Sequence, residues 1–427
     1  MIRTLLVPSS DYLGHPFPQR HNQIFEKLHD GKNFEVHVAR FKLFEKPKLK
    51  TNLIIHELSG DSAKSVRGYY LKGMINHAFE IRQLIRREAI DVVVLSNLSA
   101  PFSFTLLEKL SSMNIPVVFD LPDYYPTSAA GYLCDVNSVK GSLLVGSFDF
   151  MLRRILRNST VITTPSSTLV NYARQAGAKN VVLLPNGVSE SFLLSPCNGD
   201  NVRKKIGFSK DDFVAGYIGS VEFWLDFKCL IKGVSLAKKQ GLPIKLLLVG
   251  KGLYTDYAKK VMQWIKQENL EKETSSLGFV PYSEVPEYIS AMDVGLIPFD
   301  VLNPTAFYSA PNKMWEYLSQ MKPVISTSIP ESLLNSSSLS IASTPAEYAK
   351  HFFSIAQKDQ EITDKVNFGY KEAHTKTWEN SSIAFGNLLR NLVKETDLVE
   401  FNCTLDDESN PYPLSIFERI TAGLRNR

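Results

Sequence analysis

The chain has 427 residues, of which 44% are hydrophobic and 22% charged, and its formal net charge at pH 7 is +4. This length exceeds what one hydrophobic core usually supports, so we expect two domains. So mild a charge does not argue for nucleic acid as a partner, although a local basic patch would suit an anionic membrane or substrate. Four scattered cysteines without a metal-ligand spacing favour neither a disulfide framework nor a zinc site, and a reducing cytoplasm is the expected compartment. The N-terminus is typical of a buried strand rather than a signal peptide, and no run reaches the roughly 18 apolar residues of a membrane span.

Short apolar, β-branched runs alternate along the chain with longer stretches of helical period. Continuous apolar runs separated by helices indicate parallel strands that are buried on both faces. The first series of strands is expected at 4–8, 34–39, 92–95, 117–120, 160–164 and 181–184, and the second at 213–218, 244–249, 274–277, 294–297 and 324–326. Two such series predict an α/β protein with two doubly wound, Rossmann-like domains.

The pattern lapses between residues 186 and 212, which are rich in Asn, Gly, Ser and Lys. We therefore expect a first domain at 1–190, a linker at 191–210, a second domain at 211–395 and a tail at 396–427. In the tail, apolar residues recur at helical spacing among arginines, which favours a closing helix over a membrane-surface helix. Ligands of such folds bind beyond the carboxyl ends of the strands, so the site is expected in the cleft between the domains.

The segment 309–323, SAPNKMWEYLSQMKP, has the composition of an anion-binding helix start. Ser309 is expected as the N-cap, with Pro311 in the first turn, and the free backbone N–H groups there suit a diphosphate. Lys313 adds a positive charge, and Glu316, on the same helix face, can accept hydrogen bonds from ribose hydroxyls. An exposed ion pair between Lys313 and Glu316 on an ordinary helix explains the segment equally well when it is taken alone.

Several passages in a fixed order decide between these interpretations. They are VITTPSSTLVNYARQAGAKNVVLLPNGV (161–188), KLLLVGKG (245–252), LGFVPYSEVPEYISAMDVGLIPF (277–299) and MKPVISTSIPE after the helix. Together they resemble the GT-B glycosyltransferases of family 4 (glycosyl transferases group 1) over about residues 1–395. The resemblance implies two Rossmann-like domains facing across a cleft, with the donor held by the second domain. Its donor-binding positions would be Gly219, Gly250, Gly252, Phe279, Val280, Ser309, Asn312, Lys313 and Glu316. A plain strand-to-helix turn explains Gly219 almost as well.

The sequence departs from the family at two points. Many members carry a first glutamate that meets the donor sugar, and Tyr308 stands at that position here. Many members also follow the glycine turn with a basic pair, whereas this chain has Trp224 and Asp226 after Gly219. This second pattern is similar to a branch that includes bacterial glucuronosyltransferase-like enzymes. The identity of the donor sugar therefore cannot be inferred from the main group of the family.

The first domain supplies the candidate acceptor and catalytic residues. Gly14, His15, Arg20 and His21 lie in the loop after the first strand and are expected at the cleft, although a loop histidine is more often merely solvated. Asp120 and Asp123 follow a buried strand, and one of them would be the base that deprotonates the acceptor hydroxyl. A loop or cap carboxylate is the alternative. Phe119 replaces the histidine of the HD pair that is frequent in retaining members, so an inverting reaction is favoured.

No DxD metal motif follows a strand, and a lysine with a helix start can hold a diphosphate, so neither a metal nor a cofactor is expected. Residues 66–87 and 141–158 combine large apolar side chains with arginines. They would either rest on an anionic leaflet at the inner face of the plasma membrane or pack as ordinary helices of the first domain.

The sequence thus predicts a hexosyltransferase that uses a nucleotide-diphosphate sugar, UDP-sugar favoured, and a glycan or polyprenyl-linked acceptor. A non-catalytic nucleotide-sugar-binding protein and a GT-B sugar-nucleotide epimerase are the alternatives. A nicotinamide dehydrogenase is disfavoured because no G-x-G-x-x-G follows the first strand.

Overall fold

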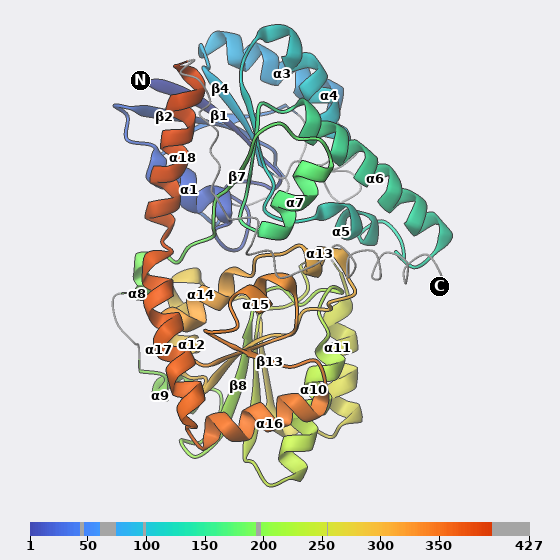
Figure 1. Ribbon diagram of the computed structural model, residues 1–427, viewed down its shortest axis with the longest axis vertical. Helices are drawn as coiled ribbons and strands as arrows, with labels where there is room; N and C mark the ends of the chain where they lie inside the picture. The colour runs from blue at the N-terminus through green and yellow to red at the C-terminus, as the bar shows by residue number, and fades with distance from the viewer. Residues whose placement is uncertain (43–46, 60–73, 97–99, 194–197, 254, 395–427) are drawn as a thin grey trace.

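The computed structural model describes residues 1–42, 47–59, 74–96, 100–193, 198–253 and 255–394, and they form two parallel sheets, each flanked by helices (Figure 1). The first sheet has the order β3-β2-β1-β4-β5-β6-β7 and the second the order β10-β9-β8-β11-β12-β13. The strands of the first are β1 (Ile2–Pro8), β2 (Phe34–Arg40), β3 (Ile54–Glu57), β4 (Val92–Ser96), β5 (Val117–Asp120), β6 (Val161–Thr164) and β7 (Val181–Leu183). Those of the second are β8 (Phe213–Ile218), β9 (Ile244–Val249), β10 (Thr274–Leu277), β11 (Val294–Ile297), β12 (Val324–Ser326) and β13 (Ser340–Ile341).

Helices cover both sheets, and in the described part of the chain they follow the strands in alternation. Those of the first half are α1 (Arg20–Leu28), α3 (Met74–Arg87), α4 (Ala100–Leu110), α5 (Tyr125–Gly131), α6 (Val139–Asn158) and α7 (Ser167–Gln175). Those that follow are α8 (Glu190–Leu193), α9 (Asp200–Lys205), α10 (Phe227–Lys239), α11 (Tyr257–Gln267), α12 (Val285–Ser290), α13 (Pro304–Phe307), α14 (Asn312–Ser319), α15 (Pro330–Leu334), α16 (Pro345–Ala356), α17 (Gln360–Thr375) and α18 (Trp378–Val393).

The central strands lie where the sequence predicted them because they are apolar on both faces. In β4, for example, all five residues are buried, as parallel strands between two helical layers require. Each of the eleven expected strands is present, with ends that shift by no more than two residues. The sequence missed the two edge strands β3 and β13. The first contains only half-exposed or exposed residues and the second is two residues long, so neither gives an apolar run.

The domain boundary is more complex than a single linker. The predicted linker at 191–210 contains most of α8 and all of α9. In Figure 1, α17 runs along the second domain while α18 continues along the first. Trp378, Phe385 and Leu389 of α18 are buried with Ile24 and Phe25 of α1. The last helix of the range 211–395 therefore belongs to the first domain by packing, because an amphipathic pattern does not say which sheet it will cover. The predicted tail at 396–427 lies outside the described residues.

Within the described residues the chain consequently crosses between the domains twice, and the two crossings are hydrogen-bonded to each other. Val188 N–H donates to Lys376 O at 2.9 Å, and Trp378 N–H donates to Val188 O at 3.2 Å. Gly187 lies so close to the second crossing that a Cβ there would be 2.4 Å from the Thr377 carbonyl carbon. Glycine is required at this position because two backbones meet there.

Candidate functional site

A pocket of about 470 Å³ lies between the two domains, at the carboxyl ends of strands of both sheets. This is where a doubly wound fold places its ligands. It is lined by four of the predicted residues of the first domain and seven of the second, namely His15, Arg20, His21, Asp123, Gly219, Phe279, Val280, Ser309, Asn312, Lys313 and Glu316. Four predicted residues do not line it: Gly14, Asp120, Gly250 and Gly252.

Two glycines shape the floor of the pocket by close backbone packing. Gly219 has φ +139° and Gly250 φ +133°, which are conformations that favour glycine. A Cβ on Gly250 would lie 2.0 Å from Gly219 O, and one on Gly219 would lie 3.4 Å from Lys313 Cε. Gly250 therefore acts behind the pocket wall, whereas the missing side chain of Gly219 leaves room for the lysine.

Lys313 stands in the second-domain wall of the pocket without an ion pair among the described residues. Its ammonium lies 5.4 Å from the ring centre of Tyr217 and 5.1 Å from that of Phe299. Burial lowers its pKa to about 8, against the opposing effect of the Glu316 and Asp123 carboxylates. A cation held on aromatic faces and not neutralised by a carboxylate is well suited to an incoming anion.

Glu316 does not pair with Lys313, so the alternative of an exposed ion pair on an ordinary helix does not hold. The buried Glu316 Oε1 accepts hydrogen bonds from Tyr282 OH and Asn312 Nδ2, both at 3.0 Å. Burial raises the pKa of Glu316, although these two donors and Lys313 lower it in part. The carboxylate is thus held in one orientation at the pocket wall.

The predicted capping role of Ser309 is wrong. Helix α14 begins at Asn312, its N-cap is Pro311, and the cap makes no side-chain hydrogen bond. Ser309 Oγ instead donates to Ala306 O at 2.8 Å, because the short helix α13 ends two residues earlier. Ser309 lines the pocket as the end of α13, a feature that the sequence did not reveal.

Asp120 is committed to a buried ion pair and does not face the pocket. It accepts Arg20 Nε at 3.2 and 3.3 Å and Thr163 Oγ1 at 2.8 Å. Arg20 is also bound at its other nitrogens, which donate to Leu184 O and Asn186 Oδ1, both at 2.8 Å. Because the Asp120 carboxylate is held by these bonds and is not accessible from the pocket, Asp123 remains as the candidate general base.

Asn186 carries this network across to the second domain. Its Nδ2 donates to Ala310 O at 2.9 Å, directly before α14. The chain Asp120–Arg20–Asn186–Ala310 therefore fixes the loop that carries Lys313 relative to the first domain.

Asp123 is the acidic group that opens into the pocket from the first domain. Its side chain is exposed to the pocket and makes no hydrogen bond among the described residues. Protein around the cleft displaces water from the carboxylate, which raises its pKa to about 6, although Lys313 and Arg20 oppose the shift. A carboxyl group that titrates near neutrality is what a general base requires.

The two predicted histidines are buried rather than solvated. His15 Nδ1 lies 2.8 Å from Phe17 O and its Nε2 lies 3.0 Å from Gln19 Nε2. Burial lowers the pKa of His15 to about 4 and that of His21 to about 3, so both rings are neutral at pH 7. His21 Nδ1 lies 3.4 Å from Ser96 Oγ.

Among the described residues, several buried polar atoms of pocket-lining side chains have no hydrogen-bond partner, including His21 Nε2, Thr305 Oγ1, Asn312 Oδ1 and Trp378 Nε1. Such atoms are rare in folded proteins because each one costs desolvation energy. Their gathering around one pocket indicates that a polar ligand completes them.

Other residues in or near the pocket were not predicted as site residues from the sequence. Tyr308 packs against Tyr124 and Tyr172 of the first domain, with ring centres 5.0 and 5.5 Å away, instead of facing the pocket. Trp224 lines the pocket, whereas Asp226 caps α10 by accepting from Cys229 N–H at 3.0 Å. No sequence pattern indicated a role for the fully buried Glu222, which accepts Leu253 N–H at 2.7 Å and so holds the loop after β9.

Comparison with known proteins identifies the class. A family described as "Glycosyl transferase 4-like domain" matches residues 60–187, and one described as "Glycosyl transferases group 1" matches residues 212–357. The two ranges together cover more than half of the chain and lie on either side of the observed domain junction. The chain belongs to the GT-B glycosyltransferases of family 4.

One curated relative is the Bacillus subtilis (strain 168) protein TuaH, whose name assigns it to teichuronic acid biosynthesis as a glycosyltransferase. The two are 26% identical over 232 residues, which are 53% of this chain and 54% of TuaH. The chain thus matches about half the length of this relative.

Solved structures share the fold over nearly the whole chain. Sucrose-phosphate synthase from Thermosynechococcus elongatus has a TM-score of 0.71 at 13% identity and covers 93% of this chain and 100% of its own. Anabaena HepE in complex with UDP and glucose has a TM-score of 0.69 at 15% identity, with coverage of 92% and 100%. Trehalose 6-phosphate synthase from Burkholderia multivorans has a TM-score of 0.68 at 9% identity, with the same coverage.

In the described part of the chain, no helix combines the length and the apolar character needed to span a bilayer.

Proposed function

We propose that this protein transfers a hexose from a UDP-sugar to a glycan or lipid-linked oligosaccharide at the cytoplasmic face of a membrane. The observation that carries the proposal is the position of Lys313, an unpaired cation at the start of α14, opposite Asp123 across one pocket. The crystal structures of HepE with UDP and with UDP-glucose, and the role in the name of TuaH, support the donor and acceptor classes.

The donor would lie against the second domain. Its diphosphate would meet Lys313 and the free N–H groups at the start of α14, close to the backbone of Gly219. Glu316, held by Tyr282 and Asn312, would accept from the ribose hydroxyls. No metal or cofactor is needed in this arrangement, since the lysine and the helix start offset the charge of the leaving diphosphate.

The acceptor would approach from the first domain. As its hydroxyl oxygen forms a bond to the anomeric carbon, the bond from that carbon to the UDP oxygen breaks. The hydroxyl proton passes to Asp123, and the electron pair leaves with UDP beside Lys313. This single displacement inverts the anomeric centre, in agreement with the reaction expected from the sequence.

Helix α6 supports a membrane-bound acceptor. Of the two segments for which membrane contact is one of two interpretations, 66–87 lies in part outside the described residues. Helix α6 projects from the first domain (Figure 1) and exposes Leu143 and Phe150 by 68% and 66%, beside the exposed cations Lys140 and Arg154. An apolar stripe flanked by positive charge is suited to an anionic bilayer surface. Two other arginines have structural partners, because Arg153 binds Asp149 and Arg157 donates to Ala176 O.

The donor assignment is tested by thermal-shift and affinity measurements with UDP-, GDP- and ADP-sugars. The wild type should be stabilised by a UDP-sugar, and Lys313→Ala should bind it about 10- to 100-fold more weakly. Lys228→Ala, which removes an exposed lysine on α10 outside the pocket, is the control and should bind like the wild type. Stabilisation by none of the three donors would refute the proposal, and binding without turnover across glycan acceptors would favour a non-catalytic binding protein.

The membrane arm is tested by cosedimentation with anionic and neutral vesicles. Leu143→Ser with Phe150→Ser should reduce binding to anionic vesicles. Phe368→Ser, which alters a side chain 49% exposed on α17, should not. Equal binding by all three proteins would show that α6 is not the membrane contact.

A further inference from the structure

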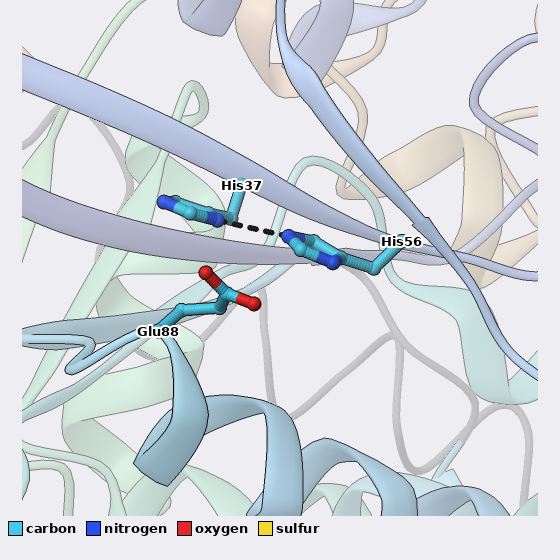
Figure 2. Close-up of side chains that lie close together, drawn as sticks. All are labelled: His37, His56 and Glu88. Carbon is cyan, nitrogen blue, oxygen red and sulfur yellow. Dashed lines mark hydrogen bonds between the residues drawn. The ribbon is translucent and has the colours of Figure 1, made fainter.

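Three metal-ligating side chains gather at the outer edge of the first sheet, away from the pocket. His37 lies on β2, His56 on the neighbouring edge strand β3, and Glu88 directly after α3 (Figure 2). One ligand atom from each lies within 4.8 Å of the other two. None of the three lines the pocket, and the proposed transfer reaction uses none of them.

The hydrogen bonds around this cluster fix the tautomers of both histidines. Arg87 Nη2 lies 3.3 Å from His56 Nδ1, and since arginine can only donate, His56 Nδ1 must accept. The His56 proton is therefore on Nε2, which lies 2.9 Å from His37 Nδ1 and donates to it. The His37 proton is in turn on Nε2, 3.3 Å from Glu35 Oε1.

This arrangement leaves His37 prepared as a ligand. Its Nδ1 lone pair points at the shared space, while its Nε2–H is anchored on a carboxylate, the orientation commonly found for metal-bound histidine. Glu35 is itself fixed by Arg3 Nε at 3.1 Å. The His37 ring is only 3% exposed and stacks on the His56 ring with 9° between the planes, so both rings are held in place.

We propose that His37, His56 and Glu88 bind a divalent transition-metal ion, Zn²⁺ by preference, with water as the fourth ligand. Two imidazoles and a carboxylate are a common zinc ligand set. At Zn–N distances of about 2.0–2.1 Å, two ligand nitrogens of a tetrahedral site lie roughly 3.3 Å apart. The present separation of 2.9 Å therefore needs to open by only a few tenths of an ångström.

Binding requires a proton to change place on His56 and Arg87 to move. Nε2 must lose its proton to become the ligand, and the neutral ring then carries that proton on Nδ1, so no proton is released. Nδ1–H cannot face Arg87, which is also a donor and is now bound to Glu88 Oε1 at 2.7 Å. Because Arg87 is 67% exposed, its side chain can turn into water and free Glu88 for the metal.

The proposed role of the ion is to fasten an edge. Among the strands that the structure describes, β3 pairs with β2 alone, and its residues are half-exposed or exposed. A metal held by β2, β3 and the end of α3 would tie this strand to the domain and would stabilise the folded state by mass action.

The test is calorimetric titration of Zn²⁺ into the full chain, prepared without a histidine tag. One ion should bind per chain, and a hundredfold excess over Kd should raise the Tm by roughly 3 °C or more. His56→Gln should weaken the affinity more than about tenfold. His351→Ala, a half-buried histidine of the second domain, is the matched control and should leave it unchanged.

Arg87→Gln is expected to change the Zn²⁺ affinity in the opposite direction from His56→Gln. It therefore tests the proposal even if His56→Gln folds poorly. A glutamine can accept from His56 Nδ1–H and carries no charge, so Zn²⁺ affinity should rise roughly twofold to fivefold. Co²⁺ should give the visible spectrum of a tetrahedral site in the wild type and in Arg87→Gln. Absence of stoichiometric binding, equal affinity in His56→Gln, or weaker binding in Arg87→Gln would each overturn the proposal.

Discussion

The two walls of the pocket differ in how their charged groups are satisfied. On the first-domain wall, Arg20 and the underlying Asp120 are tied to each other and to Thr163, Leu184 and Asn186. On the second-domain wall, Glu316 is held by hydrogen bonds, but Lys313 lies beside aromatic faces without an ion pair and Asn312 Oδ1 has no partner among the described residues. A charge that is already paired maintains the architecture, whereas an unpaired one is available to a ligand. Asp123 is the exception on the first wall, and this is why we assign it the chemistry.

Replacement of Asp123 by Asn should have the largest effect on turnover. Loss of a general base lowers kcat by about 10²- to 10⁴-fold, whereas UDP affinity should change little. Since the pKa of Asp123 is raised to about 6, the folded state disfavours its carboxylate, and Asn should not lower the Tm at pH 7. In the wild type, kcat should fall as the pH drops through about 6. A normal kcat in Asp123→Asn would show that Asp123 is not the general base.

Replacement of Arg20 by Met should instead act on folding. It leaves the buried Asp120 carboxylate without its partner, which costs about 3–5 kcal/mol of unfolding free energy. Urea denaturation of the unliganded protein measures this cost, with Lys228→Met as the surface control. An unchanged midpoint would mean that the paired charges of this wall are not structural.

The pH dependence of donor binding tests whether Lys313, on the second-domain wall, is available to a ligand. The pKa of Lys313 is lowered to about 8 in the free protein, and a bound diphosphate would raise it again. UDP affinity should therefore be full below pH 8 and fall as the pH rises above it, by at most about tenfold per pH unit. Lys313→Ala should lack this dependence. If Lys313→Ala kept the same pH profile, the pH dependence of UDP affinity would have to come from a group other than Lys313.

Glu316→Gln should give the smallest effect and should depend on the ligand. A lost charge-assisted hydrogen bond to ribose costs about 1–2 kcal/mol of UDP binding free energy. Pyrophosphate, which has no ribose, should bind the variant like the wild type, whereas Lys313→Ala should weaken both ligands. If Glu316→Gln weakened both equally, its carboxylate would act on the diphosphate or on the pocket as a whole.

The sequence predicts what depends on local pattern. Central strands such as β4 and β8 are uniform apolar runs, and Gly219, Lys313 and Glu316 stand at fixed distances from strands and helix starts, so their places follow from the chain order. Partner choice does not follow from local pattern. Asp120 and Asp123 differ in environment because Arg20, a hundred residues earlier, pairs with Asp120 and not with Asp123.

The errors have the same origin. Ser309 has the right chemistry for a cap, but a short helix that the sequence hides takes its hydroxyl. His37 and His56 lie 19 residues apart on two strands, one of which is too polar to be recognised, so their contact had no signal in the sequence.

The return of α18 to the first domain limits how the two halves can move. With one connection, a domain could swing and twist in any direction. The two connections run side by side and are paired at Val188 and Thr377. Together they restrict twisting between the domains and favour one rotation, about an axis through the two crossings. Parting of the pocket walls about this line would open the Asn186–Ala310 hydrogen bond. When the walls meet again in register, this bond re-forms and Asp123 and Lys313 return to the same opposition. A methyl group at position 187 would force these strands apart.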